Sequence, residues 1–146
     1  YGGKSQAAVA IAAHEVGHAI QHAKAYAPFK LRSTIAPAAA MGSQIAFFLL
    51  FLGFALHALS WIRLGVLLFA VAVVFQIITV PVEWDASRRA KRLLADYGLI
   101  QGGSDAAGVA KVLDAAALTY VAAAVASLLN LAYFLLRAGL LGDRRD

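Results

Sequence analysis

The stretch "IAPAAAMGSQIAFFLLFLGFALHAL", residues 35–59, contains no Lys, Arg, Asp or Glu, and "LGVLLFAVAVVFQIITVPV", residues 64–82, is a second uncharged run. Each run is long enough to cross about 30 Å of hydrocarbon at a rise of about 1.5 Å per residue. The short bend between them contains Trp61 and Arg63, two residue types that suit a membrane interface. We therefore expect a transmembrane hairpin rather than the buried hairpin of a soluble protein.

The rest of the chain fits the same class. Of the 146 residues, 62% are hydrophobic and 14% are charged, whereas soluble domains have about a quarter of their residues charged. Residues 115–136 form a third uncharged run. Residues 83–98, "EWDASRRAKRLLADYG", predict an amphipathic interfacial helix that begins after a break at Pro81 and stops at Gly98, and Ser104 could cap the next helix. We expect an all-α membrane protein, with residues 1–146 forming a single membrane-embedded domain.

The basic residues are distributed unequally about the three expected spans. Four fall on one side, namely Arg63, Arg137, Arg144 and Arg145. Nine fall on the other, namely Lys4, Lys24, Lys30, Arg32, Arg88, Arg89, Lys91, Arg92 and Lys111. The positive-inside rule places the side with nine in the cytoplasm. A lipid bilayer explains the net charge of +5 better than nucleic acid does, because no nucleic-acid motif is present.

A metal-binding pattern lies in "AAHEVGHAIQHA", residues 12–23. Residues 5–25 predict a helix with Ser5 as its N-cap, and this helix is too polar to span a bilayer. His14 and His18 are four residues apart, so both imidazoles lie on one face of that helix. Glu15 lies on the adjacent flank, where it could act as general base on a metal-bound water. The chain has no cysteine, so His, Glu or Asp must supply the ligands of any zinc.

A catalytic zinc needs a third protein ligand beside two histidines. His22 is a poor candidate, because eight helical residues separate it from His14 by about 12 Å along the axis. His57 is expected at the opposite membrane face. Glu83 is the best candidate, because the chain direction returns it to the side of His14 and because a helix start would stabilise its charge. Asp85 remains the alternative.

Several motifs together resemble the YugP-like family of neutral zinc metallopeptidases of bacterial membranes. They are "YGGKSQAAVAIAAHEVGHAIQH", "PFKLRSTIAP", "FQIITVPVEWDASRRAKRLL" and "AAALTYVAAAVASLL", and they cover nearly the whole chain in order. The resemblance implies a gluzincin-type site with one Zn²⁺ per chain, His14, His18 and Glu83 as ligands and Glu15 as catalytic base. It also implies a location in the bacterial plasma membrane and an N-terminal span that this sequence lacks. "EWDAS" is similar to the E-x-x-A-D motif of HtpX-type proteases, but Ser87 replaces its Asp and could offer only a weaker hydrogen bond.

These observations favour a membrane-embedded endopeptidase that acts on peptides or membrane proteins. Its oxyanion donor is left open among Tyr120, Tyr26 and Gln76. A site-2-type intramembrane protease would need a later Asp-Gly pair, which the sequence lacks. The non-enzyme alternative is a membrane scaffold with a structural or vestigial metal site, whose small-residue helix faces could hold together a homo-oligomer. Glu15 argues against it, because a structural site does not need that carboxylate.

Overall fold

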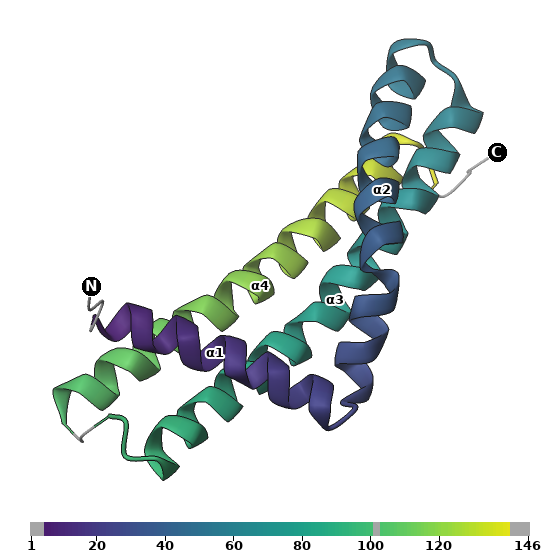
Figure 1. The fold of residues 1–146 in the computed structure, drawn as a ribbon. Helices are drawn as coiled ribbons and strands as arrows, with labels where there is room; N and C mark the ends of the chain where they lie inside the picture. Colours follow the sequence, from purple (N-terminus) through teal and green to yellow (C-terminus); the bar gives the residue numbers. More distant parts are fainter. Residues whose placement is uncertain (1–4, 101–102, 141–146) are drawn as a thin grey trace. The chain divides into compact units, whose positions relative to one another are not determined.

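The computed structural model describes residues 5–100 and 103–140, and in these ranges it contains four α-helices and no strand. They are α1 (Gln6–Ala23), α2 (Ala27–Ala55), α3 (Leu59–Asp96) and α4 (Ser104–Arg137) (Figure 1). The all-α prediction is therefore confirmed. Three of the basic residues used to infer orientation, Lys4, Arg144 and Arg145, lie outside the described residues.

The helix start predicted at Ser5 and the helix stop predicted at Gly98 both agree with the structure. The hydroxyl of Ser5 accepts a hydrogen bond from the backbone N–H of Ala8 at 3.2 Å, as an N-cap does. Past the end of α3, Gly98 has a φ of +60°, and the N–H of Leu99 donates to the carbonyl of Leu94. Glycine adopts this left-handed conformation without the steric cost that other residues pay, so it ends the helix.

The long helices α2, α3 and α4 are each long and apolar enough to cross a membrane. Only 22%, 33% and 17% of the residues in their most apolar windows are buried inside the protein. Large side chains such as Phe48, Phe51 and Leu67 are consequently exposed. Apolar surface of this extent suits contact with lipid rather than water.

The break expected at Pro81 is wrong, because α3 continues through Pro81 to Asp96. Proline removes one backbone donor, so it costs the helix one hydrogen bond, to the carbonyl four residues earlier. The turns that follow are held by packing, since Val82, Ala86 and Ala90 are fully buried. The charged segment is therefore the C-terminal part of α3 rather than a separate interfacial helix, and Glu83 does not lie at a helix start.

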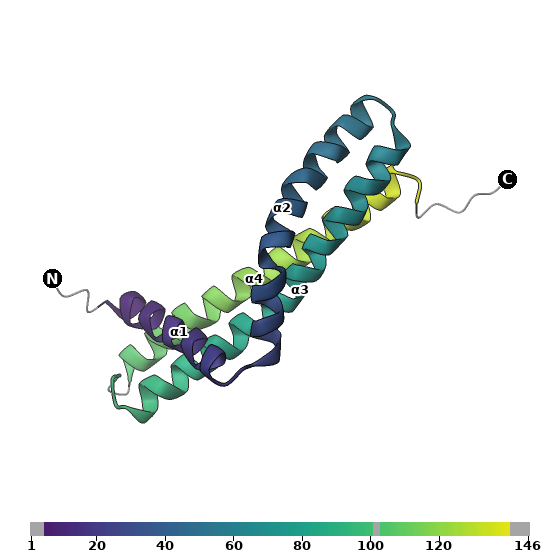
Figure 2. The same ribbon diagram turned by 45° about the vertical axis from the view of Figure 1, so that its right-hand side comes forward.

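The chain forms two compact units, and α3 and α4 contribute to both. The first unit combines α1 with the part of α3 from Ile78 onward and the part of α4 up to Ala122. All three helices contribute to its core, which consists of Ala10, Ala13, Ala90, Leu94, Val109 and Leu113. Figure 2 shows α1 beside these parts of α3 and α4. This unit contains the candidate site.

The second unit contains α2 from Arg32, the part of α3 up to Ile77, and the part of α4 from Ala123. Glycines let α2 and α3 approach closely, because a Cβ added to Gly53 would lie 2.8 Å from Cγ1 of Ile62. The rings of Phe69 and Phe134 meet edge to face, with their centroids 5.4 Å apart. Close packing of small and aromatic residues is the usual way in which apolar helices associate in lipid.

Gly17 sets the distance between α1 and α3 in the first unit. A Cβ at this position would lie 2.5 Å from the backbone oxygen of Ala86, which is closer than two such atoms can approach. Because the obstacle is backbone rather than a flexible side chain, a larger residue would have to push the helices apart. Gly17 is the residue directly before His18, so this contact also fixes the height of the histidines above α3.

We expect Gly17→Ala to lower the free energy of unfolding by about 1–3 kcal/mol, the usual cost of overpacking. Gly42→Ala is the matched control, because an added Cβ there meets no described atom within 4 Å and helix propensity should raise stability by about 0.5–1 kcal/mol. Both can be measured by unfolding in detergent followed by circular dichroism. A Gly17→Ala protein as stable as the Gly42→Ala protein would contradict the close contact.

Candidate metal centre

Three potential ligands converge where α1 crosses α3. Nε2 of His14 lies 3.0 Å from Oε2 of Glu83, and Nε2 of His18 lies 3.5 Å from the same oxygen. The ligand atoms of all three residues lie within 4.8 Å of one another. The histidine side chains are 15% and 17% exposed, whereas Glu83, which follows His14 by 69 residues, is 1% exposed. The helix crossing therefore brings together the two histidines and the carboxylate that the sequence suggested.

These residues fit a zinc ion. Zinc takes His nitrogen and carboxylate oxygen at about 2.0–2.1 Å in tetrahedral geometry, so its ligand atoms lie about 3.3 Å apart. The separations of 3.0 and 3.5 Å from Oε2 bracket that value. Three protein ligands also leave a fourth position for water or substrate, as catalytic zinc sites do. The partial exposure of the histidines leaves that side of the site accessible.

The other ring nitrogen of His14 is held by α3 and α4 together. Nδ1 of His14 lies 3.2 Å from the hydroxyl of Ser87, and that hydroxyl donates to the carbonyl of Leu113 at 3.3 Å. Because the single hydroxyl proton is directed to a carbonyl, the Ser87 oxygen is left to accept from His14. Ser87 is only 3% exposed. It replaces the Asp of the E-x-x-A-D motif and makes the hydroxyl hydrogen bond that the sequence analysis allowed for this position.

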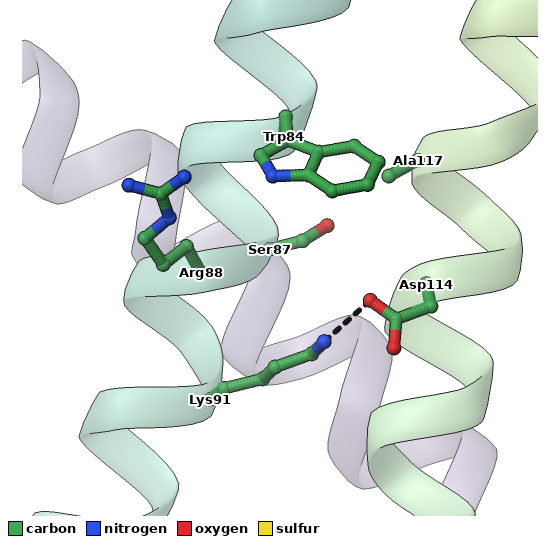
Figure 3. Close-up of a pocket in the computed structure, with 6 residues that line it drawn as sticks. All are labelled: Trp84, Ser87, Arg88, Lys91, Asp114 and Ala117. Atoms are coloured by element: carbon green, nitrogen blue, oxygen red, sulfur yellow. Dashed lines mark hydrogen bonds and ion pairs between the residues drawn. The ribbon is translucent and has the colours of Figure 1, made fainter.

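A small cavity of about 100 Å³ adjoins Ser87 between α3 and α4. Figure 3 shows the Ser87 hydroxyl directed toward α4, the ion pair between Lys91 and Asp114 beside it, and Arg88 extending the other way. None of the three candidate ligands lines this cavity. It is therefore distinct from the metal centre.

Gln21 holds the other ring nitrogen of His18, and the sequence reasoning did not identify it. Its Oε1 lies 2.9 Å from Nδ1 of His18, and its amide nitrogen donates to the carbonyl of Val82 at 2.8 Å and to Asp85 at 2.9 Å. Gln21 is 0% exposed. It follows His18 by three residues and His14 by seven, which places all three on one helix face. That spacing is the sequence signal that could have identified Gln21 as a neighbour of the histidines.

Asp85 lies outside the ligand cluster and belongs to this second network. It accepts a hydrogen bond from Nε of Arg89 at 2.6 Å, and the Arg89 guanidinium lies 5.6 Å from the ring centre of Tyr26. Asp85 lies beyond the uncharged run that ends at Val82. Burial raises its pKa, but the hydrogen bonds from Arg89 and Gln21 outweigh this effect and leave the pKa below its ordinary value. Asp85 is therefore a charged anchor, and it is not among the clustered ligands.

The remaining predicted residues occupy different places. Glu15 is exposed on α1, and His22 is exposed with its ring 6.2 Å from that of Phe29. Tyr26 and Tyr120 belong to the same unit as the metal centre, whereas His57 and Gln76 belong to the other. His22 is outside the ligand cluster, in line with its rejection from helix geometry.

Comparison with known proteins agrees with the motifs. Residues 1–139 match the family described as "Putative neutral zinc metallopeptidase". The protein named "Putative membrane protease YugP", from Bacillus subtilis (strain 168), is 47% identical over 136 residues. That alignment covers 93% of this chain and 60% of the relative, so the chain spans about three fifths of the relative's length. No solved structure matches the chain significantly.

We expect Ser87→Ala to lower the free energy of unfolding by about 1–2 kcal/mol, because His14 loses a buried hydrogen-bond partner. Ser43→Ala is the control, since the Ser43 hydroxyl bonds only within its own helix, to the carbonyl of Ala40, and gains the same helix propensity. The difference between the two variants, measured by unfolding in detergent without metal, isolates the bond. Equal stabilities would show that Ser87 does not hold His14.

Proposed function

Because the chain belongs to the family of putative neutral zinc metallopeptidases, we propose that it is a membrane-embedded zinc endopeptidase. His14, His18 and Glu83 would hold one zinc ion, and Glu15 would act as general base. The observation that carries the proposal is the convergence of the two HExxH histidines with a buried carboxylate from a distant helix. The name of the Bacillus subtilis relative, "Putative membrane protease YugP", supports the same activity.

A zinc ion at this position would supply a Lewis acid and lower the pKa of a water molecule at its open site. The chain's own residues supply the proton transfers. Glu15 follows His14 directly and is exposed, so its carboxylate can accept a proton from the attacking water and return it to the leaving amine. The helix crossing keeps Glu83 in position through these transfers, and the hydrogen bonds at Nδ1 hold the two imidazoles.

The membrane setting follows from the helices and charges. Three helices are long and apolar enough to cross a bilayer, and we infer a multi-pass protein of the bacterial plasma membrane. Five of the nine basic residues on the majority side lie within nine residues of His18 or Glu83 in the sequence, namely Lys24, Arg88, Arg89, Lys91 and Arg92. This bias favours a cytoplasmic active site, with peptides or membrane proteins as substrates.

The alternatives fit less well. An intramembrane site-2-type protease would carry HExxH inside a spanning helix, but α1 has 18 residues and is not among the described helices long and apolar enough to cross a membrane. A scaffold with a structural metal site would have no use for Glu15 beside the ligands. The exposed position of Glu15 next to the partly exposed three-ligand cluster favours hydrolysis.

The zinc content of purified variants distinguishes the metal ligands from neighbouring residues that do not bind the metal. We expect close to one zinc per purified chain, because three ligands converge, and we expect Glu83→Ala to abolish it. His22→Ala should retain the zinc, since His22 lies outside the cluster. Elemental mass spectrometry of the detergent-solubilised proteins makes the comparison. Zinc that persists without Glu83, or is lost without His22, would refute the ligand set.

The role of Glu15 predicts a different pattern. Glu15→Gln should keep the zinc but lower cleavage of an unfolded protein substrate by at least about 10²-fold, the lower range of general-base catalysis. The control is Asp96→Asn, which likewise removes an exposed carboxylate but at the end of α3, outside the ligand cluster. Activity would be followed by fluorescence of a quenched, labelled substrate. Undiminished cleavage by the Glu15→Gln protein would exclude Glu15 as the base.

A further inference from the structure

We propose that Gln21 is a positioning residue that holds His18 in the tautomer with hydrogen on Nδ1, so that Nε2 presents its lone pair toward Glu83. The inference rests on the proposed zinc site, because this tautomer leaves Nε2 of His18 able to bind zinc. The geometry itself involves only residues of the first unit.

The first step is the orientation of the Gln21 amide. One end of the amide faces the carbonyl of Val82 at 2.8 Å and Oδ2 of Asp85 at 2.9 Å. Neither group can donate a hydrogen bond, because one is a carbonyl oxygen and the other is a carboxylate. The nitrogen must therefore occupy this end, and both of its hydrogens are used. The oxygen is left facing His18.

The second step is the tautomer of His18. Nδ1 of His18 lies 2.9 Å from Oε1 of Gln21, an atom that can only accept. With hydrogen on Nδ1 the contact is a hydrogen bond, whereas with hydrogen on Nε2 two lone pairs would face each other. Because Gln21 is 0% exposed, water cannot relieve that repulsion. A neutral imidazole has one N–H, so Nε2 is left as a lone-pair donor on the side of Glu83.

The third step is what holds Gln21. Asp85 accepts from Gln21 and also from Nε of Arg89 at 2.6 Å, so the carboxylate remains an acceptor. The Arg89 guanidinium in turn lies over the ring of Tyr26, which follows α1. The chain Arg89–Asp85–Gln21–His18 therefore runs from α3 to the metal-facing ring, and each link fixes the donor direction of the next. Outer hydrogen bonds of this kind typically contribute about 10–100-fold to metal affinity.

The direct test is the ¹⁵N spectrum of histidine-labelled, metal-free protein in detergent micelles at about pH 8.5, well above the ordinary histidine pKa of about 6.5. Nitrogen shifts distinguish the two tautomers, and His18→Gln assigns the signal. We expect His18 with hydrogen on Nδ1, and Gln21→Met, which has a similar shape but no amide, should shift the signal toward the other tautomer. His18 mainly in the Nε2–H form in the wild-type protein would overturn the proposal, even if the variant does not fold.

Zinc affinity supplies the second readout. By chelator competition, Gln21→Met should bind zinc about 10–100-fold more weakly, whereas His22→Ala, one residue along and exposed, should bind as the wild type does. Unchanged affinity in a folded Gln21→Met protein would overturn the positioning role while leaving the zinc site intact. A wild-type protein that binds no zinc would instead refute the proposed function, and the tautomer measurement would still decide the role of Gln21.

Discussion

The crossing of α1 over the C-terminal part of α3 is the constraint on which the site depends. Gly17 lies against the backbone of Ala86, so the two helix axes approach more closely than any side chain at that point would allow. One face of α3 then serves two purposes. Val82, Ala86 and Ala90 pack the helices together with no exposed surface, and Glu83 and Ser87, on the adjoining positions, reach His14. The distance between carboxylate and imidazole is thus set by helix packing rather than by a flexible loop, which is what a preorganised metal site needs.

The crossing also buries several polar side chains. Gln21, Glu83 and Ser87 are all buried, and a buried polar group costs free energy unless it is hydrogen-bonded. For Ser87 and Gln21 this cost is offset by two hydrogen-bond networks, one from Ser87 to His14 and one from Gln21 to His18. Each network ends on a backbone carbonyl, of Leu113 or Val82, that cannot change its role. Hydrogen bonds at Nδ1 therefore fix both imidazole rings. The Nε2 atoms remain on the side of Glu83, where a ligand or ion can contact them.

The sequence was informative wherever a local rule decides the structure. Uncharged runs predicted the three long helices, and Ser5 and Gly98 marked helix ends because capping depends on a few neighbouring residues. The pairing of Glu83 with the histidines was predicted from chain direction, and the structure brings those three residues together. Pro81 misled the reasoning, because a local rule for helix breaking was outweighed by tertiary packing of the turns beyond it. Gln21 was missed because a glutamine on a helix is ordinarily solvated, and only its match to Val82 and Asp85 on another helix gives it a role.

The continuity of α3 changes the physical account of Glu83. A helix start would have stabilised its charge through the macrodipole, but that effect fades beyond the first turn, and Glu83 lies far inside α3. Its 1% exposed carboxylate therefore faces two imidazole nitrogens whose rings already direct their Nδ1 sides to Ser87 and Gln21. A divalent cation satisfies both nitrogens and the carboxylate oxygen at once, so the loss of the helix-start explanation strengthens the argument for a metal at this crossing.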